Sequence, residues 1–317
     1  MKGSANYQVH MLFKKSGINA IGTSKHAAKA AAREFITTAG FRGSRSATWH
    51  EIGKQLGVHS YATADAYRDT WRHILQHAKE KFHVKDIEKL TSEHIASYLK
   101  TKVDQGVAHA TFMQYAAAAE KLETALNMYS ERFTRGKTYD FSSAIKPLRQ
   151  SASKTLQHFS GHREYLHPEK IVDNMKNPVY KTIAELQYRA GLRVKETNMI
   201  RSSQLLPDNR FKVEGGKGGK IRIIDLPSDL HQKLEKLVNE SGDRLEFKEN
   251  SYRQALKEAC ASAGEEYTGT HGLRWTYAQN QFQEYQLQGE TYEQAEQHIS
   301  NDLGHNRADI TQHYLGH

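Results

Sequence analysis

The sequence predicts a mainly α-helical protein with a small β-hairpin, an α+β fold arranged as two units. Three observations lead to this prediction. Apolar residues recur at helical spacing through most of the 317 residues. The segment RFKVEGGKGGKIRIIDLP (210–227) has two β-rich runs joined by glycines. A polar stretch at 150–162 has the composition of a linker, and the chain is long enough for a core on either side of it.

The N-terminal half reads as a bundle of helices. Residues 24–39 begin at a capping Ser24, continue through a run of alanines and end before Gly40. A short helix up to Leu56, a turn at 57–60 and a helix over 63–82 follow; a DNA-binding helix-turn-helix is the alternative interpretation of this stretch. Further helices are predicted over 89–106 and 108–133.

The C-terminal half alternates helices with the hairpin. Helical patterns precede the hairpin at 165–175 and 177–191. Amphipathic helices follow it at 228–241 and 250–264, and helical sequence continues from His271 to the terminus.

Charge is distributed unevenly between these halves. The net charge is +9, and residues 1–160 contain 24 Lys and Arg against 13 Asp and Glu, whereas the remainder contains 21 against 23. A basic half is suited to contact nucleic-acid phosphates. The alternative is that these residues form a solvated basic surface.

Several classes are disfavoured by composition. The mean hydropathy is −0.76, no apolar run is long enough to span a bilayer, and the first residues lack the apolar core of a signal peptide. Cys260 is the single cysteine and cannot form an internal disulfide. We therefore expect a protein of the reducing cytoplasm.

Four short motifs of the C-terminal half contain chemically capable side chains. Taken one at a time, each has an ordinary explanation as a surface ion pair, a turn or a packed aromatic residue. The motifs are AGLRVKET with Arg193 and Glu196, GGKGGK with Lys217 and Lys220, HGLR with His271 and Arg274, and LGH with His305, which Tyr314 follows by nine positions.

In this order the motifs resemble the catalytic domain of the tyrosine recombinases, the family of phage integrases and Xer-type enzymes. YATADAYRDTWRHIL followed by LTSEHIASYL resembles the family's helical core-binding domain, and REYLHPEKIVDNM resembles the start of its catalytic domain. The resemblance runs from about residue 60 to the end and implies an N-terminal helical core-binding domain and a catalytic domain that close on DNA as a clamp. We expect an extension of unknown role at 1–45, a core-type domain at 46–150, a linker at 151–162 and a catalytic domain at 163–317.

The resemblance also implies a role for each motif residue. Arg193 and Arg274 would hold the phosphate oxygens, because a guanidinium binds them in a planar, bidentate way. His271 would accept the proton of the nucleophile Tyr314, whose phenol has an ordinary pKa near ~10. Of the remaining residues, His305 would hydrogen-bond the phosphate, Lys217 or alternatively Lys220 would protonate the leaving 5′ oxygen, and Glu196 would orient Arg193 or a histidine.

The implied activity is site-specific DNA recombination through a 3′-phosphotyrosine intermediate and a Holliday junction, for a phage or another mobile element. The implied partners are double-stranded DNA with paired core sites, further copies in a tetrameric synapse, and accessory directionality or host DNA-bending proteins. No cofactor or metal is expected, and the location would be the bacterial cytoplasm. Candidate DNA contacts are Lys220, Arg222, Arg45, Lys54, Arg68 and Arg72.

Two features depart from the family pattern. The stretch between HGLR and LGH is long and acidic, and only three residues follow Tyr314. Three alternatives stay open: a type IB topoisomerase-like enzyme, a non-enzymatic DNA-binding regulator, and a metalloprotein whose ligands would be His271, His305, His313 and His317. The metalloprotein is disfavoured because no strong ligand spacing is present.

Overall fold

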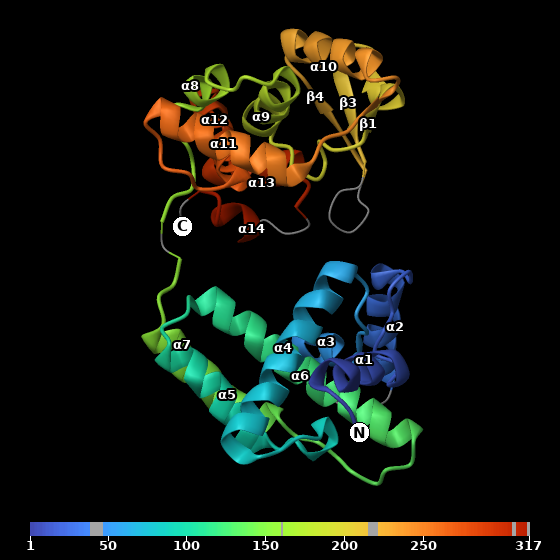
Figure 1. The fold of residues 1–317 in the computed structure, drawn as a ribbon. Coiled ribbons are helices and arrows are strands. Elements are labelled where there is room, and N and C mark those ends of the chain that lie inside the picture. Colours follow the sequence, from blue (N-terminus) through green and yellow to red (C-terminus); the bar gives the residue numbers. More distant parts are fainter. Residues whose placement is uncertain (39–46, 160, 215–220, 306–308, 316–317) are drawn as a thin grey trace. The chain divides into compact units, whose positions relative to one another are not determined.

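The computed structural model describes residues 1–38, 47–159, 161–214, 221–305 and 309–315. The chain divides into two compact units, Met1–Phe159 and Ser160–His317 (Figure 1), and each has its own hydrophobic core. Helices dominate both units, and the strands are short and antiparallel. The predicted fold class is therefore confirmed. Within the described ranges, no helix is both long enough and apolar enough to span a membrane.

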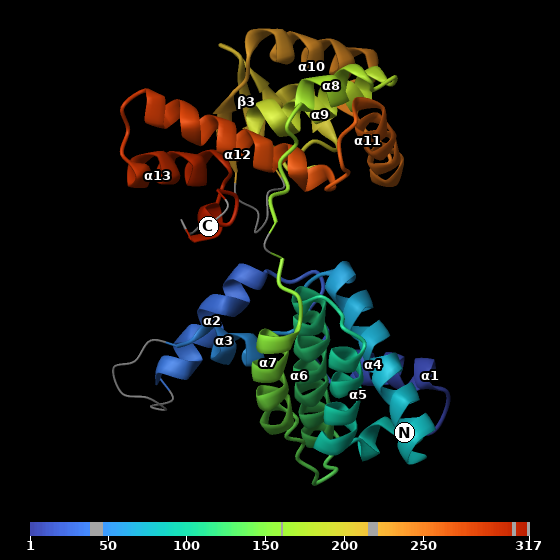
Figure 2. The same cartoon turned by 90° about the vertical axis from the view of Figure 1, so that its left-hand side faces the viewer.

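The N-terminal unit is a bundle built around its two longest helices, α4 and α6. Figure 2 shows α5, α6 and α7 packed side by side. Trp71 of α4 is fully buried and donates from Nε1 to the Ala118 carbonyl of α6 at 2.7 Å, which fixes the two helices to each other. The elements are α1 (Ala5–Lys15), α2 (Lys25–Thr38), α3 (Trp49–Gln55), α4 (Tyr61–Phe82), η1 (Ile87–Lys89), α5 (Ser92–Asp104), α6 (His109–Arg132) and α7 (Ser142–Thr155).

The first helix gives part of the N-terminal extension a structural position. α1 buries Val9, Leu12 and Phe13 in the core of the bundle. Its Gln8 side chain donates to the Lys85 carbonyl and accepts from the Ile87 N–H, at 2.8 and 2.9 Å. α1 is therefore part of the bundle itself, whereas the sequence assigns no role to residues 1–45.

The end of α7 differs from the linker expected at 151–162. The helix continues to Thr155, because Ala152 and Leu156 are buried against the bundle. These apolar contacts outweigh the linker-like composition of the segment, since burial stabilises a helix whose intrinsic propensity is modest.

The C-terminal unit packs helices around α9 and α12, beside two small sheets. One sheet has the order β2-β3-β4, with Phe211 of β3 paired to Ile224 of β4, and the other pairs β1 with β5. The elements are α8 (Pro168–Asp173), α9 (Pro178–Ala190), β1 (Ile200–Arg201), η2 (Ser202–Gln204), β2 (Leu205–Leu206), β3 (Arg210–Val213), β4 (Arg222–Asp225), α10 (Ser228–Glu240), β5 (Arg244–Leu245), α11 (Glu249–Ala263), α12 (Thr270–Leu287), α13 (Tyr292–Asp302) and α14 (Asp309–Gln312).

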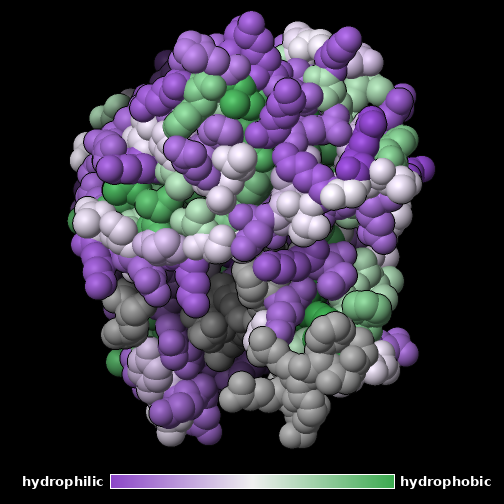
Figure 3. All heavy atoms as spheres, turned by 90° about the horizontal axis from the view of Figure 1, so that it is seen from below, coloured by the Kyte–Doolittle hydropathy of each residue, from purple (hydrophilic) through white to green (hydrophobic). Residues whose placement is uncertain are grey.

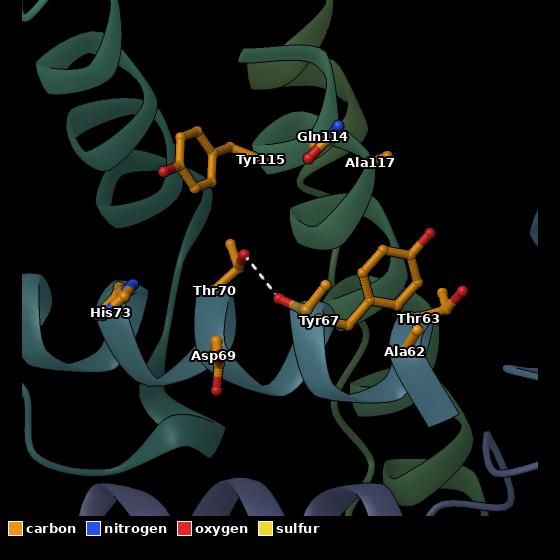
Figure 4. Close-up of a pocket in the computed structure, with 10 residues that line it drawn as sticks. Ala62, Thr63, Tyr67, Asp69, Thr70, His73, Gln114, Tyr115 and Ala117 are labelled. Carbon is orange, nitrogen blue, oxygen red and sulfur yellow. Dashed lines mark hydrogen bonds between the residues drawn. The ribbon is translucent and has the colours of Figure 1, made fainter. Parts of the chain in front are cut away.

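The surface seen in Figure 3 is mostly hydrophilic, with small apolar areas between polar side chains. Between α4 and α6 of the N-terminal unit lies an open hollow of about 490 Å³. Tyr67 and Thr70 of α4 and Tyr115 of α6 line it (Figure 4), and the Thr70 hydroxyl donates back to the Ala66 carbonyl of its own helix. None of its lining residues belongs to the C-terminal unit, where the motif residues meet.

Candidate active site

The first part of the site is the turn that follows α9. This helix ends at Gly191, whose φ is +65°, and a Cβ at this position would lie 2.5 Å from the Tyr277 ring. Both the left-handed conformation and the close approach require glycine here. Just beyond it, Arg193 donates from Nη1 to Oε1 of Glu196 at 2.7 Å and from its backbone N–H to Oε2 at 2.9 Å. Glu196 is buried, so the pair is an internal contact of the site.

Arg222 at the start of β4 is a second partner of Glu196. Its Nη1 and Nη2 donate to Oε1 and Oε2 of this carboxylate at 3.0 and 2.9 Å, and its side chain is 8% exposed. The sequence suggests a DNA contact for Arg222, which stays a prediction; in the structure its side chain is engaged with Glu196. Because a buried carboxylate needs charged partners, Arg222 is turned inward and is not a surface residue.

The start of α12 brings in two further motif residues, His271 and Arg274. The intervening Gly272 is required by close packing, since a Cβ there would lie 2.5 Å from the Arg163 carbonyl oxygen. Arg274 is completely buried and donates to the carbonyl oxygens of Gly191 and Leu303. Its Nε has no hydrogen-bond partner among the described residues.

The guanidinium of Arg274 is buried, which disfavours its charged form. Burial, and then the charge of the neighbouring Arg193, lower the pKa of its guanidinium to about 10. The group still carries its charge at neutral pH. A buried cation with a free N–H is the kind of group that an anionic ligand would stabilise.

His305 follows the turn that ends α13. Its backbone N–H donates to the Ser300 carbonyl at 2.8 Å, and its ring is buried. Nε2 lies 3.3 Å from Nη2 of Arg274, and Nδ1 lies 3.0 Å from Oγ1 of Thr311 on α14. Burial, and then the charge of Arg274, lower the pKa of His305 to about 3, so the ring is neutral at neutral pH.

Tyr314 lies two residues after the end of α14 and points back into the unit. It is 5% exposed, and its hydroxyl oxygen is 2.7 Å from Nε2 of His271. Its ring packs against Trp275 and His305, with centroids 5.4 and 5.2 Å away, and the Arg274 guanidinium lies 5.8 Å from its centroid. The tyrosine, both histidines and Arg274 therefore converge within a single C-terminal unit.

His271 is suited to accept a proton from this tyrosine. Burial, and then the charges of Arg274 and Arg193, lower its pKa to about 4. The imidazole is therefore neutral at neutral pH, and Nε2 can accept the phenolic proton over the 2.7 Å contact.

The structure describes only some of the remaining candidate residues. Lys217, Lys220 and Arg45 lie outside the described residues. Lys54 is exposed on α3. Arg68 and Arg72 of α4 are partly exposed, and each forms an ion pair with the aspartate three residues earlier on the same helix, Asp65 and Asp69 respectively.

Two residues join the site without any signal from the four motifs. Thr311 contacts His305 and is completely buried, and Trp275 packs on the ring of Tyr314. Thr311 precedes Tyr314 by three positions, so helical spacing offers a weak signal that the two share a face. The ring of His313 packs edge-on against Trp275 at 5.1 Å, and His317 lies outside the described residues. In the part of the chain that the structure describes, no group of three or more His, Cys, Asp or Glu side chains is placed to hold a metal ion.

This fold and this arrangement of residues define a tyrosine recombinase. Sequence comparison agrees: the phage integrase family matches residues 166–317, and the phage integrase N-terminal SAM-like domain matches residues 55–127. The chain belongs to the phage integrase family.

Individual relatives show how far the similarity extends. Tyrosine recombinase XerD of Oceanobacillus iheyensis is 27% identical over 215 residues, which are 68% of this chain and 66% of XerD. XerH site-specific recombinase, in a post-cleavage complex with its palindromic difH substrate, is 16% identical with a TM-score of 0.61, over 98% of this chain and 90% of XerH. A lambda integrase dimer bound to a COC′ core site is 16% identical with a TM-score of 0.55, over 92% of this chain and 77% of the integrase. The two structural similarities concern the fold.

Proposed function

We propose that this chain is a site-specific DNA recombinase that cuts and rejoins strands through a 3′-phosphotyrosine intermediate. One observation carries the proposal: the Tyr314 hydroxyl lies 2.7 Å from a neutral histidine, beside the buried Arg274, whose Nε lacks a partner among the described residues. A nucleophile, a proton acceptor and a site for a developing anionic charge are therefore adjacent.

The chemical step follows from these positions. The phenolic oxygen of Tyr314 attacks the scissile phosphorus and its proton passes to Nε2 of His271, while the bond from phosphorus to the 5′ oxygen breaks. The leaving 5′ oxygen takes up a proton, for which Lys217 is the candidate donor and Lys220 the alternative. Arg193, Arg274 and His305 hydrogen-bond the non-bridging oxygens, on which charge grows in the transition state. Religation is the same transesterification in reverse, so it needs no nucleotide hydrolysis and no metal.

DNA is the proposed partner, with paired core sites held in a tetrameric synapse of four copies. Support comes from the relatives, since XerH was seen with its difH substrate and lambda integrase on a core site. The basic excess of residues 1–160 suits contact with phosphates, and we propose that the two units close on the duplex as a clamp. Strand exchange would pass through a Holliday junction.

The biological setting is proposed on weaker support. Integration or excision of a phage or another mobile element, in the bacterial cytoplasm and with accessory directionality or host DNA-bending proteins, fits a member of this family. A topoisomerase-like nicking and closing activity would use the same residues on a single duplex. Conversion of a synapsed pair of sites into recombinant products separates the two activities.

A nicked suicide substrate tests the cleavage step. Because the short strand beyond the nick diffuses away after cleavage, the wild-type protein should accumulate as a covalent adduct, in EDTA as well as without it. Tyr314→Phe should bind the same DNA with an unchanged Kd and form no adduct, because only the hydroxyl is lost. Tyr292→Phe, at the start of α13, is the matched control and should react normally. An adduct formed by Tyr314→Phe would place the nucleophile elsewhere, and a requirement for added metal would contradict the mechanism.

A further inference from the structure

Arg222 makes three side-chain hydrogen bonds inside the catalytic unit. Nη1 and Nη2 donate to both carboxylate oxygens of Glu196, and Nε donates to the Asp302 carbonyl at 2.9 Å. The side chain of Arg222 is 8% exposed and that of Glu196 is 1% exposed. A planar fork with each of its nitrogens engaged in this way has one favourable orientation.

Through Glu196, Arg222 acts on Arg193. The carboxylate is shared, because Oε1 also accepts from Nη1 of Arg193 and Oε2 from the backbone N–H of the same residue. Burial raises the pKa of Glu196, but the hydrogen bonds and charge of Arg222, followed by the backbone N–H and charge of Arg193, outweigh burial and lower the pKa to about 2. Glu196 is therefore ionised, and its orientation is fixed from the Arg222 side.

Arg222 also affects how much positive charge the site offers to a bound phosphate. Three guanidinium groups surround the Glu196 carboxylate, those of Arg193, Arg222 and Arg274. Nη1 of Arg274 lies 3.9 Å from this carboxylate. Without Arg222, the full negative charge of Glu196 would fall on Arg193 and Arg274, the two groups proposed to hold the phosphate. These guanidinium groups would then be drawn toward the carboxylate and away from the DNA.

A third contact reaches the segment that carries His305. Arg222 binds the carbonyl of Asp302, the last residue of α13, and two residues later the chain turns at Gly304 with a φ of +62°. A Cβ on Gly304 would lie 3.0 Å from Nη1 of Arg222, so the turn packs directly on the guanidinium. His305 follows this turn immediately.

We propose that Arg222 is a positioning residue of the cleavage reaction. It connects β4 to the Arg193–Glu196 turn and to the turn before His305. In this way it holds Arg193 and His305 in their positions relative to each other, without contacting DNA. This inference rests on the proposed function. The opposing hypothesis, which the sequence favours, is that Arg222 is itself a phosphate contact.

Single-turnover cleavage and DNA binding separate these two hypotheses. Arg222→Met and Arg222→Lys should each cleave the suicide substrate about 100-fold more slowly, because a shift of about 1 Å in a reacting group has an effect of this size. Lysine fails as well because an ammonium group cannot replace the fork. The Kd for the same DNA, and its dependence on salt, should stay within about 2-fold of wild type, since no phosphate contact is removed.

The control and the double variant complete the test. Arg210→Met in β3 removes an arginine whose side chain is 45% exposed, and it should cleave like wild type. Glu196→Gln combined with Arg222→Met removes the buried charge that Arg222 balances. This double variant should cleave no more slowly than Arg222→Met alone, and thermal unfolding shows whether each variant is folded.

Each result has one meaning. Cleavage by folded Arg222→Met within about 3-fold of wild type would overturn the positioning role. A weaker Kd with a salt slope shallower by about one would identify a phosphate contact instead. If Arg222→Met does not fold, Arg222→Lys and the double variant decide the question by the same criteria. Absence of cleavage by the wild-type protein would contradict the proposed function, and that outcome is visible before any variant is compared.

Discussion

The hydroxyl oxygen of Tyr314 lies 2.7 Å from Nε2 of His271 in the same C-terminal unit. Trp275 packs on the tyrosine ring, and the Arg274 guanidinium lies 5.8 Å from the centroid of the same ring. The proposed nucleophile is therefore in contact with the group proposed to take its proton. For the reaction to proceed, the histidine must be neutral and the phosphate ligands must be correctly presented, and both requirements lead to measurements.

Protonation of the two histidines should occur far below the usual range for histidine. A histidine with a folded pKa near 4 or 3 stays neutral where an ordinary histidine, with a pKa near ~6.5, is already charged. We expect NMR titration of the DNA-free protein to show His271 half-protonated near pH 4 and His305 lower still. Ordinary titration of His271 near pH 6.5 would contradict its proposed role as a neutral proton acceptor.

The same depressed pKa values predict how stability changes with pH. Below pH 6.5 the unfolded chain takes up protons at these two histidines and the folded chain does not, so the free energy of unfolding falls as the pH drops from about 6.5 toward 4. Replacing both histidines by Gln should make the melting temperature less dependent on pH in this window. An unchanged pH dependence would mean that the two rings are not held neutral by the fold.

The two arginines should not tolerate replacement by lysine. Arg193→Lys and Arg274→Lys keep the positive charge but lose the planar fork, and each should reduce the cleavage rate by about 100-fold or more. Arg253→Lys on α11, where the arginine pairs with Glu249 at the surface, is the matched control and should have little effect. Near-normal single-turnover cleavage by either variant would remove that arginine from the site.

Thr311 should matter through its hydroxyl group alone. Its Oγ1 lies 3.0 Å from Nδ1 of His305. Because the Arg274 guanidinium, 3.3 Å from Nε2, can only donate, the neutral ring accepts at Nε2 and donates from Nδ1 to Thr311, which fixes the orientation of the ring. Thr311→Val keeps the shape and removes this hydrogen bond, so cleavage should slow by about 10-fold. Thr311→Ser keeps the hydroxyl and should cleave within about 3-fold of wild type. Equal rates for the Val and Ser variants would mean that the threonine only packs.

The sequence predicts those site residues that stand in short, recognisable motifs. Arg193, His271, Arg274, His305 and Tyr314 stand in short motifs, and the structure brings them together in one unit. The hairpin is predicted for the same reason, because its glycines and β-branched residues are neighbours in the chain. The helices of the bundle follow from periodicity, which is also a local property.

Properties that depend on distant packing are not predicted. In the sequence, Arg222 resembles an ordinary surface cation. Only the folded structure places it against the buried Glu196. α1 belongs to the core because Gln8 meets the backbone near Ile87, far along the chain. α7 extends into the segment expected as a linker, 151–162, because Ala152 is buried against the bundle. In each case the deciding interaction is tertiary, and composition carries no information about it.

The uneven charge predicts a division of labour between the two units. The fragment 160–317 has its own hydrophobic core and should fold, but it contains slightly more acidic than basic residues and should bind DNA weakly. The full chain adds the basic excess of residues 1–160, so more counterions are released on binding, and its affinity should fall steeply with salt. Fluorescence anisotropy on one DNA site should therefore give a markedly shallower slope of log affinity against log salt for the fragment. Equal slopes would contradict the division, because they would show that the Lys and Arg excess of the N-terminal unit is a solvated surface that releases no counterions from DNA.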